Sequence, residues 1–96
     1  MELIHHPAVA RDIARAALWY RGIDPALEQA FLAELKAAFL RIEASPQRFH
    51  FDRCGWRRLN LKRFPYHVLF EEAPEMIRVL VVRHHHQNPR FGVTRQ

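Results

Sequence analysis

The sequence is poor in the residues from which several common functional sites are built. It has one cysteine, Cys54, and three glycines among 96 residues. A single cysteine cannot form an intramolecular disulfide bond, and it cannot supply a cysteine pair to a metal. No glycine-rich stretch has the form of a phosphate-binding loop. These absences leave no support for a disulfide framework, a cysteine-based metal site or a phosphate loop.

Long apolar runs are also missing. No stretch approaches the roughly 20 apolar residues that a membrane-spanning helix needs. The N-terminal stretch breaks at Pro7 and carries Arg11, Asp12 and Arg15 where a signal peptide requires an unbroken apolar segment. We therefore expect a cytoplasmic protein with no membrane partner, and the single cysteine fits a reducing compartment.

Acidic residues are scarce in the second half of the chain. Residues 53–96 contain nine Lys and Arg against three Asp and Glu, whereas residues 1–52 contain six against seven. Basicity confined to one half suits an anionic partner, either nucleic acid or an acidic protein segment. The alternative is a small solvated basic domain that binds no polyanion. At this length we expect one domain, residues 1–96.

The first half of the chain predicts a short strand followed by two helices. Leu3 and Ile4 indicate a brief strand that ends before a proline. Apolar residues at helical spacing predict a helix over residues 8–21, stopped by Gly22. The pair Asp24-Pro25 is typical of a helix start, and the apolar spacing behind it predicts a second helix that continues to Ser45-Pro46. The short connection between them predicts an antiparallel helical hairpin.

The second half predicts three strands. Apolar and polar residues alternate over Arg57 to Lys62, which gives one apolar and one polar face. Residues 66–71 and 76–82 are apolar on both faces, as in strands at the centre of a sheet. Connections of a few residues are too short for a parallel crossover, so the three strands should form an antiparallel meander. The fold class is therefore α+β, in the order β-α-α-β-β-β, with the hairpin covering one face of the sheet.

Two stretches in this second half have a more specific form. Phe64-Pro65-Tyr66 opens a strand just after the basic strand, and Val79 to Phe91 is a strand that ends in a His/Arg-rich segment before a proline and an aromatic residue. In the order and content of its parts, nearly the whole chain resembles the RelE/ParE superfamily of toxins from type II toxin-antitoxin systems. The resemblance implies a RelE/ParE-like fold and a toxin that a cognate antitoxin holds inactive, in a hetero-oligomer, by wrapping a helix and an extended segment around it.

The resemblance implies one of two toxic activities. RelE-like members cut messenger RNA on the ribosome, and ParE-like members poison DNA gyrase. Only the first activity would make the chain an enzyme, an endoribonuclease. A third possibility is a non-toxic relic of the fold that only binds an antitoxin or nucleic acid.

An endoribonuclease of this kind needs a base for the ribose 2′-hydroxyl, cations for the phosphate and an acid for the leaving oxygen. RelE-like members use Lys, Arg and Tyr on adjacent strands; here His67 stands in place of a strand arginine, and His86-Gln87-Asn88 replaces the terminal arginine-rich segment. Arg58 and Lys62, on one face of the basic strand, are the remaining candidates. If the chain is a ribonuclease, its catalytic residues would therefore be His67, His86, Arg58 and Lys62. The alternative for His67 is a partly buried strand histidine satisfied by a hydrogen-bond partner.

A gyrase poison needs a complementary surface and no catalytic residue. The Phe-Pro-Tyr strand and a terminal segment of the form His-x-x-x-x-Pro are closer to the ParE side of the superfamily, so we expect gyrase as the target. The residues expected to contact the target, whether gyrase or the ribosome with its mRNA, are Arg58, Lys62, His84, His86 and Arg90.

The three consecutive histidines, His84, His85 and His86, raise the possibility of a metal site. In a strand, neighbouring side chains point to opposite faces, so His84 and His86 would share one face and His85 the other. Three rings so arranged cannot bind one ion. We expect no metal and no cofactor.

Overall fold

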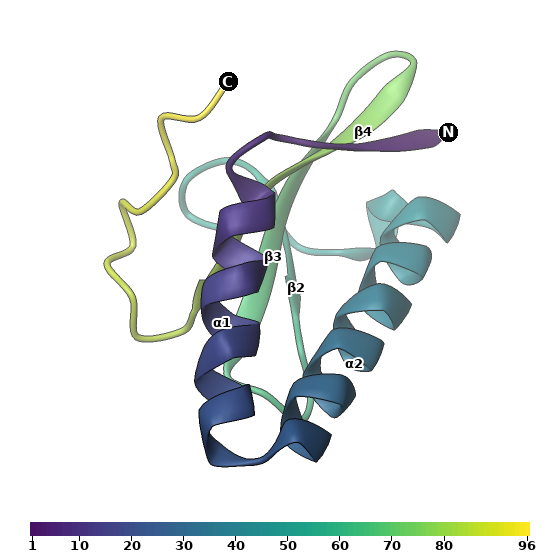
Figure 1. The fold of residues 1–96 in the computed structure, drawn as a ribbon. Helices are drawn as coiled ribbons and strands as arrows, with labels where there is room; N and C mark the ends of the chain where they lie inside the picture. Colours follow the sequence, from purple (N-terminus) through teal and green to yellow (C-terminus); the bar gives the residue numbers. More distant parts are fainter.

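The computed structural model describes residues 1–96 and contains a four-stranded sheet with two helices packed on one face (Figure 1). The elements follow in the order β1 (Glu2–His5), α1 (Val9–Ile23), α2 (Pro25–Ala44), the 3₁₀ turn η1 (Pro46–Arg48), β2 (Arg57–Asn60), β3 (Tyr66–Glu72) and β4 (Met76–His84). The predicted α+β order and the antiparallel meander of the last three strands are confirmed.

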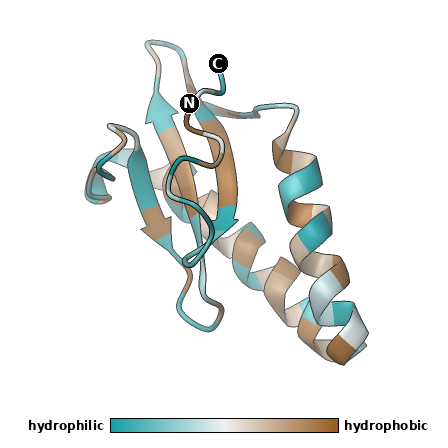
Figure 2. Cartoon of the chain, turned by 90° about the vertical axis from the view of Figure 1, so that its left-hand side faces the viewer, coloured by the Kyte–Doolittle hydropathy of each residue, from teal (hydrophilic) through white to brown (hydrophobic).

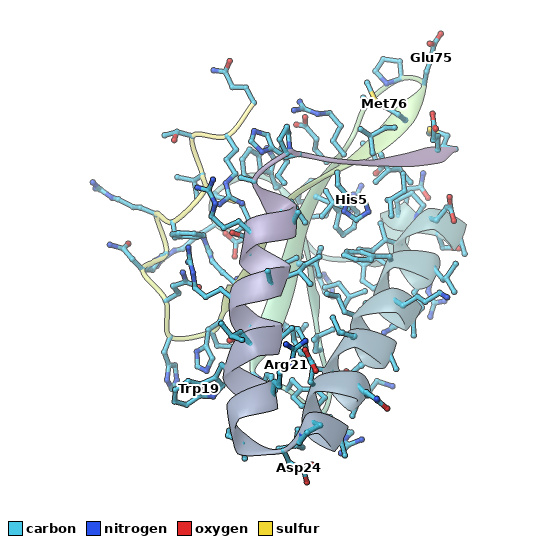
Figure 3. The ribbon with its side chains drawn as sticks, viewed as in Figure 1. His5, Trp19, Arg21, Asp24, Glu75 and Met76 are labelled. Carbon is cyan, nitrogen blue, oxygen red and sulfur yellow. The ribbon has the colours of Figure 1, made fainter.

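The hairpin of α1 and α2 turns at Asp24. Its side chain accepts a hydrogen bond from the backbone N–H of Ala26 at 2.9 Å, as an N-cap does, and its own N–H donates to the carbonyl of Tyr20. The expected stop at Gly22 was wrong, because the helix continues through Gly22 and the extended backbone of Asp24 ends it. Asp24 lies at the tip of the hairpin, and Arg21 reaches toward α2, where it pairs with Glu28 (Figure 3). Neither helix is long and apolar enough to cross a membrane.

The strands lie side by side in the order β1-β4-β3-β2. β1 pairs in parallel with β4, and the other two pairings are antiparallel. β2 ends at Asn60, two residues before the predicted end at Lys62. Beyond Asn60 the pairing with β3 is incomplete, because the N–H of Tyr66 donates to the carbonyl of Phe64 and not to β2. The backbone N–H groups of Lys62 and Arg63 donate to the carboxylate of Glu34 on α2. Lys62 therefore lies in the connection after the strand and not on it.

The main core lies between the helices and the sheet. Phe31 and Ile42 of α2 and Val68 and Phe70 of β3 have no exposed surface, and burial of each such side chain contributes about 1.5–3 kcal/mol. A second, smaller cluster on the opposite face contains Leu69, Leu80 and Val81, with Trp56 and Phe91 packed against it. Figure 2 shows the C-terminal segment, residues 85–96, lying over this side of the strands.

The C-terminal segment closes one edge of the sheet. β1 pairs with β4 only as far as Val79, so the next groups on that edge of β4 have no strand beside them. The carbonyl of Leu80 accepts a hydrogen bond from Arg95 at 2.9 Å, and the N–H of Val82 donates to Asp12 of α1 at 3.0 Å. Asp12 and Arg95 are themselves joined by two bonds, of 2.6 and 3.0 Å, with side chains 2% and 14% exposed. This buried ion pair ties α1, β4 and the C-terminal segment together, and the segment runs along the side of α1 away from α2 (Figure 1).

Gly92 allows the segment to lie close to β4. Its φ is +79°, which favours glycine, and a Cβ on it would lie 2.6 Å from Cγ2 of Val81. Arg83 adds a second attachment, since its guanidinium donates to the carbonyls of Pro89 and Phe91 at 2.7 and 3.0 Å.

Candidate functional site

Two clusters of polar side chains lie where β4 ends, one on each face of the sheet. Arg83 and His84 are consecutive in β4, so their side chains point to opposite faces. Arg83 faces away from the helices, toward His67 of β3 and His85, and these three form what we call the arginine–histidine cluster. His84 faces the helix side, where it meets Tyr66 and His86 in the tyrosine–histidine cluster.

The arginine–histidine cluster is a chain of hydrogen bonds with a fixed direction. Nε of Arg83 donates to Nε2 of His67 at 2.9 Å, and Nδ1 of His67 lies 2.9 Å from Nδ1 of His85. Because arginine only donates, Nε2 of His67 must be an acceptor, and the hydrogen of the neutral ring lies on Nδ1. Nδ1 of His67 therefore donates to His85, whose ring stacks on it at a centroid distance of 5.2 Å.

Both histidines of the arginine–histidine cluster are held neutral. Burial, together with the charges of Arg58 and Arg83 and the neighbouring His85, lowers the pKa of His67 to about 3. Burial and the charge of Arg58 also lower the pKa of His85. His67 is only 1% exposed and both of its ring nitrogens are engaged. At neutral pH it is a structural link between strands.

Beside this cluster, Arg58 forms an ion pair with a carboxylate. Its guanidinium donates to Asp52 at 3.0 Å and to the side chain of Asn60 at 2.7 Å. Burial alone would raise the pKa of Asp52, but hydrogen bonds from Cys54 and the contact with Arg58 lower that pKa to about 2. The predicted cation of the basic strand is therefore held in an ion pair with a carboxylate.

The tyrosine–histidine cluster is more open. The rings of Tyr66 and His84 meet edge to face at 5.1 Å, and those of His84 and His86 at 5.3 Å. Tyr66 and His84 line a hollow of about 390 Å³ together with Arg15 and Trp19 of α1. Trp19 projects from the side of α1 away from α2 (Figure 3). Burial raises the pKa of Tyr66, so its hydroxyl stays protonated at neutral pH.

The structure does not bring the predicted site residues into one place. His67 and Arg58 lie on the face of the sheet away from the helices, His84 and His86 in the tyrosine–histidine cluster, and Lys62 in a groove beside α2. Arg90 lies on the C-terminal segment, in a pocket of about 380 Å³ that Arg53 also lines.

Only the first of the three consecutive histidines lies in a strand. β4 ends at His84, so His85 and His86 lie in a turn and the strand rule does not govern them. His84 and His86 nevertheless lie together, and His85 lies against His67 on the other side. No group of three potential metal-ligating side chains is placed to hold one ion.

Sequence reasoning missed Arg83 and Asp52, the two residues that fix this arrangement. Arg83 follows an apolar run of β4, where the sequence offered no reason to expect an arginine that is only 3% exposed. The available signal was positional: Arg83 pairs directly with His67 across the two strands, and in a correct register the two side chains share one face.

The fold resembles that of a known toxin-antitoxin protein. A chain in a solved structure of the chromosomal ParDE TA system from P. aeruginosa superimposes with a TM-score of 0.75 at 17% sequence identity, covering 88% of this chain and 95% of that one. At this identity the likeness concerns the fold alone. No curated protein sequence matches the chain.

The family comparison is more specific. The family model described as the ParE toxin of the type II toxin-antitoxin system, parDE, matches residues 3–89, from β1 to the turn after the three histidines. This range includes both clusters and the Phe-Pro-Tyr strand on which the resemblance was first based. The chain belongs to the ParE family of type II toxin-antitoxin toxins.

Proposed function

We propose that this toxin inhibits growth by poisoning DNA gyrase, and that a cognate antitoxin neutralises it by forming a hetero-oligomer with it. Membership of the ParE family supports the proposal. The observation that carries the choice between the two toxic activities is the state of His67, which is buried, engaged at both nitrogens and neutral, with a pKa of about 3.

A ribonuclease would need groups that exchange protons with its substrate and converge on one phosphate. His67 has no free nitrogen, and Arg58 is paired with Asp52. Lys62 lies beyond the end of β2, beside α2. Two of the four predicted catalytic residues are thus engaged in other contacts and a third lies apart from them, which favours a toxin that acts by binding.

A gyrase poison needs only a surface that fits its target. The C-terminal half carries most of the positive charge of the chain, and Arg53 and Arg90 are exposed on the same pocket. Such a surface suits a target that works on DNA. Arg58, Lys62, His84, His86 and Arg90 stay predictions as target-contacting residues.

One observation favours the ribonuclease as a second candidate. Tyr66, His84 and His86 are partly accessible, lie in mutual contact, and have Arg15 nearby. A tyrosine, two histidines and an arginine are groups that could act on a phosphodiester.

Induction of the chain in growing cells separates the candidates. Gyrase-dependent DNA breaks and ribosome-dependent mRNA cuts would be assayed in the same cultures, for the wild type and for a His84→Ala/His86→Ala variant. We expect breaks without cuts in the wild type. Cuts without breaks, lost in the variant, would establish the ribonuclease instead, and the absence of any growth effect would indicate a relic that only binds.

A further inference from the structure

A pocket of about 380 Å³ lies between the loop before β2 and the C-terminal segment. Both segments contribute to its lining: Arg53, Cys54, Asn88, Pro89, Arg90 and Val93. All of these residues except Val93 are exposed, so the pocket opens to solvent. A chemical group carried on a large molecule can therefore reach it.

The polar side chains of this pocket offer hydrogen-bond donors. Arg53 and Arg90 are positively charged, and neither has a carboxylate within ion-pair distance. Oδ1 of Asn88 accepts from the backbone N–H of Arg90 at 2.9 Å, which leaves its amide nitrogen free to donate. Partial burial raises the pKa of Cys54, so its thiol is uncharged at neutral pH. Because no acidic residue lines the pocket, it suits an anion.

Arg83 adds a buried positive charge behind the pocket. Its guanidinium donates to the carbonyl of Pro89, one of the lining residues, and to that of Phe91. Arg83 is only 3% exposed, and no carboxylate lies within ion-pair distance of it. The nearby carboxylate of Asp52 is already paired with Arg58. A buried charge without a counterion is unfavourable, and an anion in the pocket would reduce that penalty.

The lining favours one class of anion, a phosphate of a nucleic-acid duplex. An acidic protein segment binds tightly through large apolar or aromatic anchors, and no such side chain lines the pocket to receive one. An unpaired nucleotide stacks its base on an aromatic ring, and the pocket contains none. A duplex presents its phosphate oxygens outward, and guanidinium groups match these oxygens in geometry and charge.

We propose that this pocket binds a backbone phosphate of double-stranded DNA, with Arg53 and Arg90 donating hydrogen bonds to its oxygens. The choice of DNA rests on the proposed function, in which the target is an enzyme that works on DNA. The proposal adds a direct contact between the toxin and the DNA. The positive charge of residues 53–96 would strengthen that contact over a wider area.

The first test removes charge inside and outside the pocket. The full-length chain is titrated into a fluorescent DNA duplex of about 20 base pairs at several salt concentrations. Arg53→Gln/Arg90→Gln should weaken binding at least about tenfold and lower the slope of log Kd against log salt by about 1, the value of one phosphate contact. Arg11→Gln/Arg48→Gln removes the same charge from exposed arginines outside the pocket and should leave the slope unchanged. Equal losses in the two variants would overturn the site.

The second test adds a negative charge without changing side-chain shape. Asn88→Asp places a carboxylate in the pocket and keeps the oxygen that accepts from Arg90. Asn60→Asp makes the same change at an exposed position outside it. Asn88→Asp should weaken DNA binding at least about fivefold more than Asn60→Asp, because like charges repel. A thermal melt of each variant checks that it is folded, and equal effects in folded variants would contradict the proposal.

Cys54 reports directly on whether the pocket is occupied. It is the only cysteine of the chain, and it is exposed. Saturating duplex DNA should slow its modification by N-ethylmaleimide at least about fivefold, because the bound backbone covers the thiol. Unchanged modification in the presence of bound DNA would place the DNA elsewhere. Protection by inorganic phosphate and not by DNA would assign the pocket to a free anion and overturn the proposal.

Failure of this proposal differs from failure of the proposed function. Pocket variants that bind DNA like the wild type, while the wild-type chain still causes gyrase-dependent DNA breaks, would overturn only the pocket. A wild-type chain that binds DNA through the pocket and causes no breaks would overturn only gyrase poisoning. Tighter binding of an RNA duplex of the same sequence, or of a polyglutamate peptide, would overturn the choice of DNA.

Discussion

The two edges of the sheet differ in whether their outward backbone groups have hydrogen-bond partners. On the β4 edge, the backbone groups that β1 leaves unpaired are met by Asp12 and Arg95, and the C-terminal segment covers them. On the β2 edge, the outward N–H and carbonyl of Asn60 have no partner in the chain and face a groove. An open strand edge invites pairing with another chain. The fold therefore restricts such pairing to one short, positively charged position.

The β4 edge also requires the burial of two charged side chains, whose loss of hydration opposes folding. A buried ion pair loses its hydration, and it contributes to stability only if its geometry is good and its remaining hydrogen bonds are made. Asp12 and Arg95 meet both conditions, because each also bonds the backbone of β4. The following four experiments test the comparison between the edges, from the largest expected effect to the smallest.

Arg95→Met should open the closed edge. It leaves the carboxylate of Asp12 buried without its charge partner, so the free energy of unfolding should fall by about 3–5 kcal/mol. The measurement is denaturant unfolding, with Asp12→Asn/Arg95→Met as the control. The double variant should recover part of the loss, since it contains no uncompensated charge. A single variant as stable as the wild type would contradict the role given to this pair.

Gly92→Ala should disturb the same edge through packing. The added Cβ would meet Val81 at 2.6 Å, and φ is +79°. We expect a loss of about 2–3 kcal/mol. Gly55→Ala is the matched control, because φ there is also positive, at +99°, but no atom lies within 4 Å of the added Cβ. Equal losses in the two variants would show that the contact with Val81 is unimportant.

Acid should loosen the closed edge through His67. Its pKa is about 3 in the folded chain and 6.5 ordinarily, so between these values the unfolded chain binds a proton that the folded chain does not. Its contribution to stability is therefore complete above about pH 6.5 and declines as the pH falls toward about 3, by about 1.4 kcal/mol per pH unit. Proton uptake would also place a charge beside Arg83, which holds Pro89 and Phe91.

Because of His67, the free energy of unfolding should be about 2 kcal/mol lower at about pH 5 than at about pH 7. His67→Gln should remove that part of the difference, because its amide can accept from Arg83 without titrating. His50→Gln, at an exposed histidine, is the control and should keep it. The same pH dependence in His67→Gln and the wild type would exclude His67 as its source.

Glu34→Gln should have the smallest effect. Glu34 accepts backbone N–H groups at the open edge, and an amide with one acceptor oxygen keeps only part of this interaction. We expect a loss of about 1 kcal/mol in the free energy of unfolding. A loss as large as that of Arg95→Met would mean that the two edges do not differ in their contribution to stability.

The sequence predicted local features better than long-range ones. The helix start at Asp24 and the alternation around Leu59 depend on neighbouring residues, and both were found. The parallel pairing of β1 with β4 and the Asp12–Arg95 pair join residues more than 70 positions apart, and no local pattern encodes them. The environment of His67 depends on the register of three strands, so the sequence could only leave a catalytic and a structural alternative open.

Hydrogen bonds run in one direction from Arg83 to His67 and on to His85. This direction decides what kind of molecule can bind to His85, the last residue of the series. His85 accepts at Nδ1, so its neutral ring carries the hydrogen on Nε2, which has no partner within the chain. Metal ions bind histidine through a nitrogen lone pair, and here neither nitrogen of His85 offers one. A molecule that meets His85 must therefore bring the acceptor itself, as the oxygens of a phosphate, a carboxylate or a peptide carbonyl do.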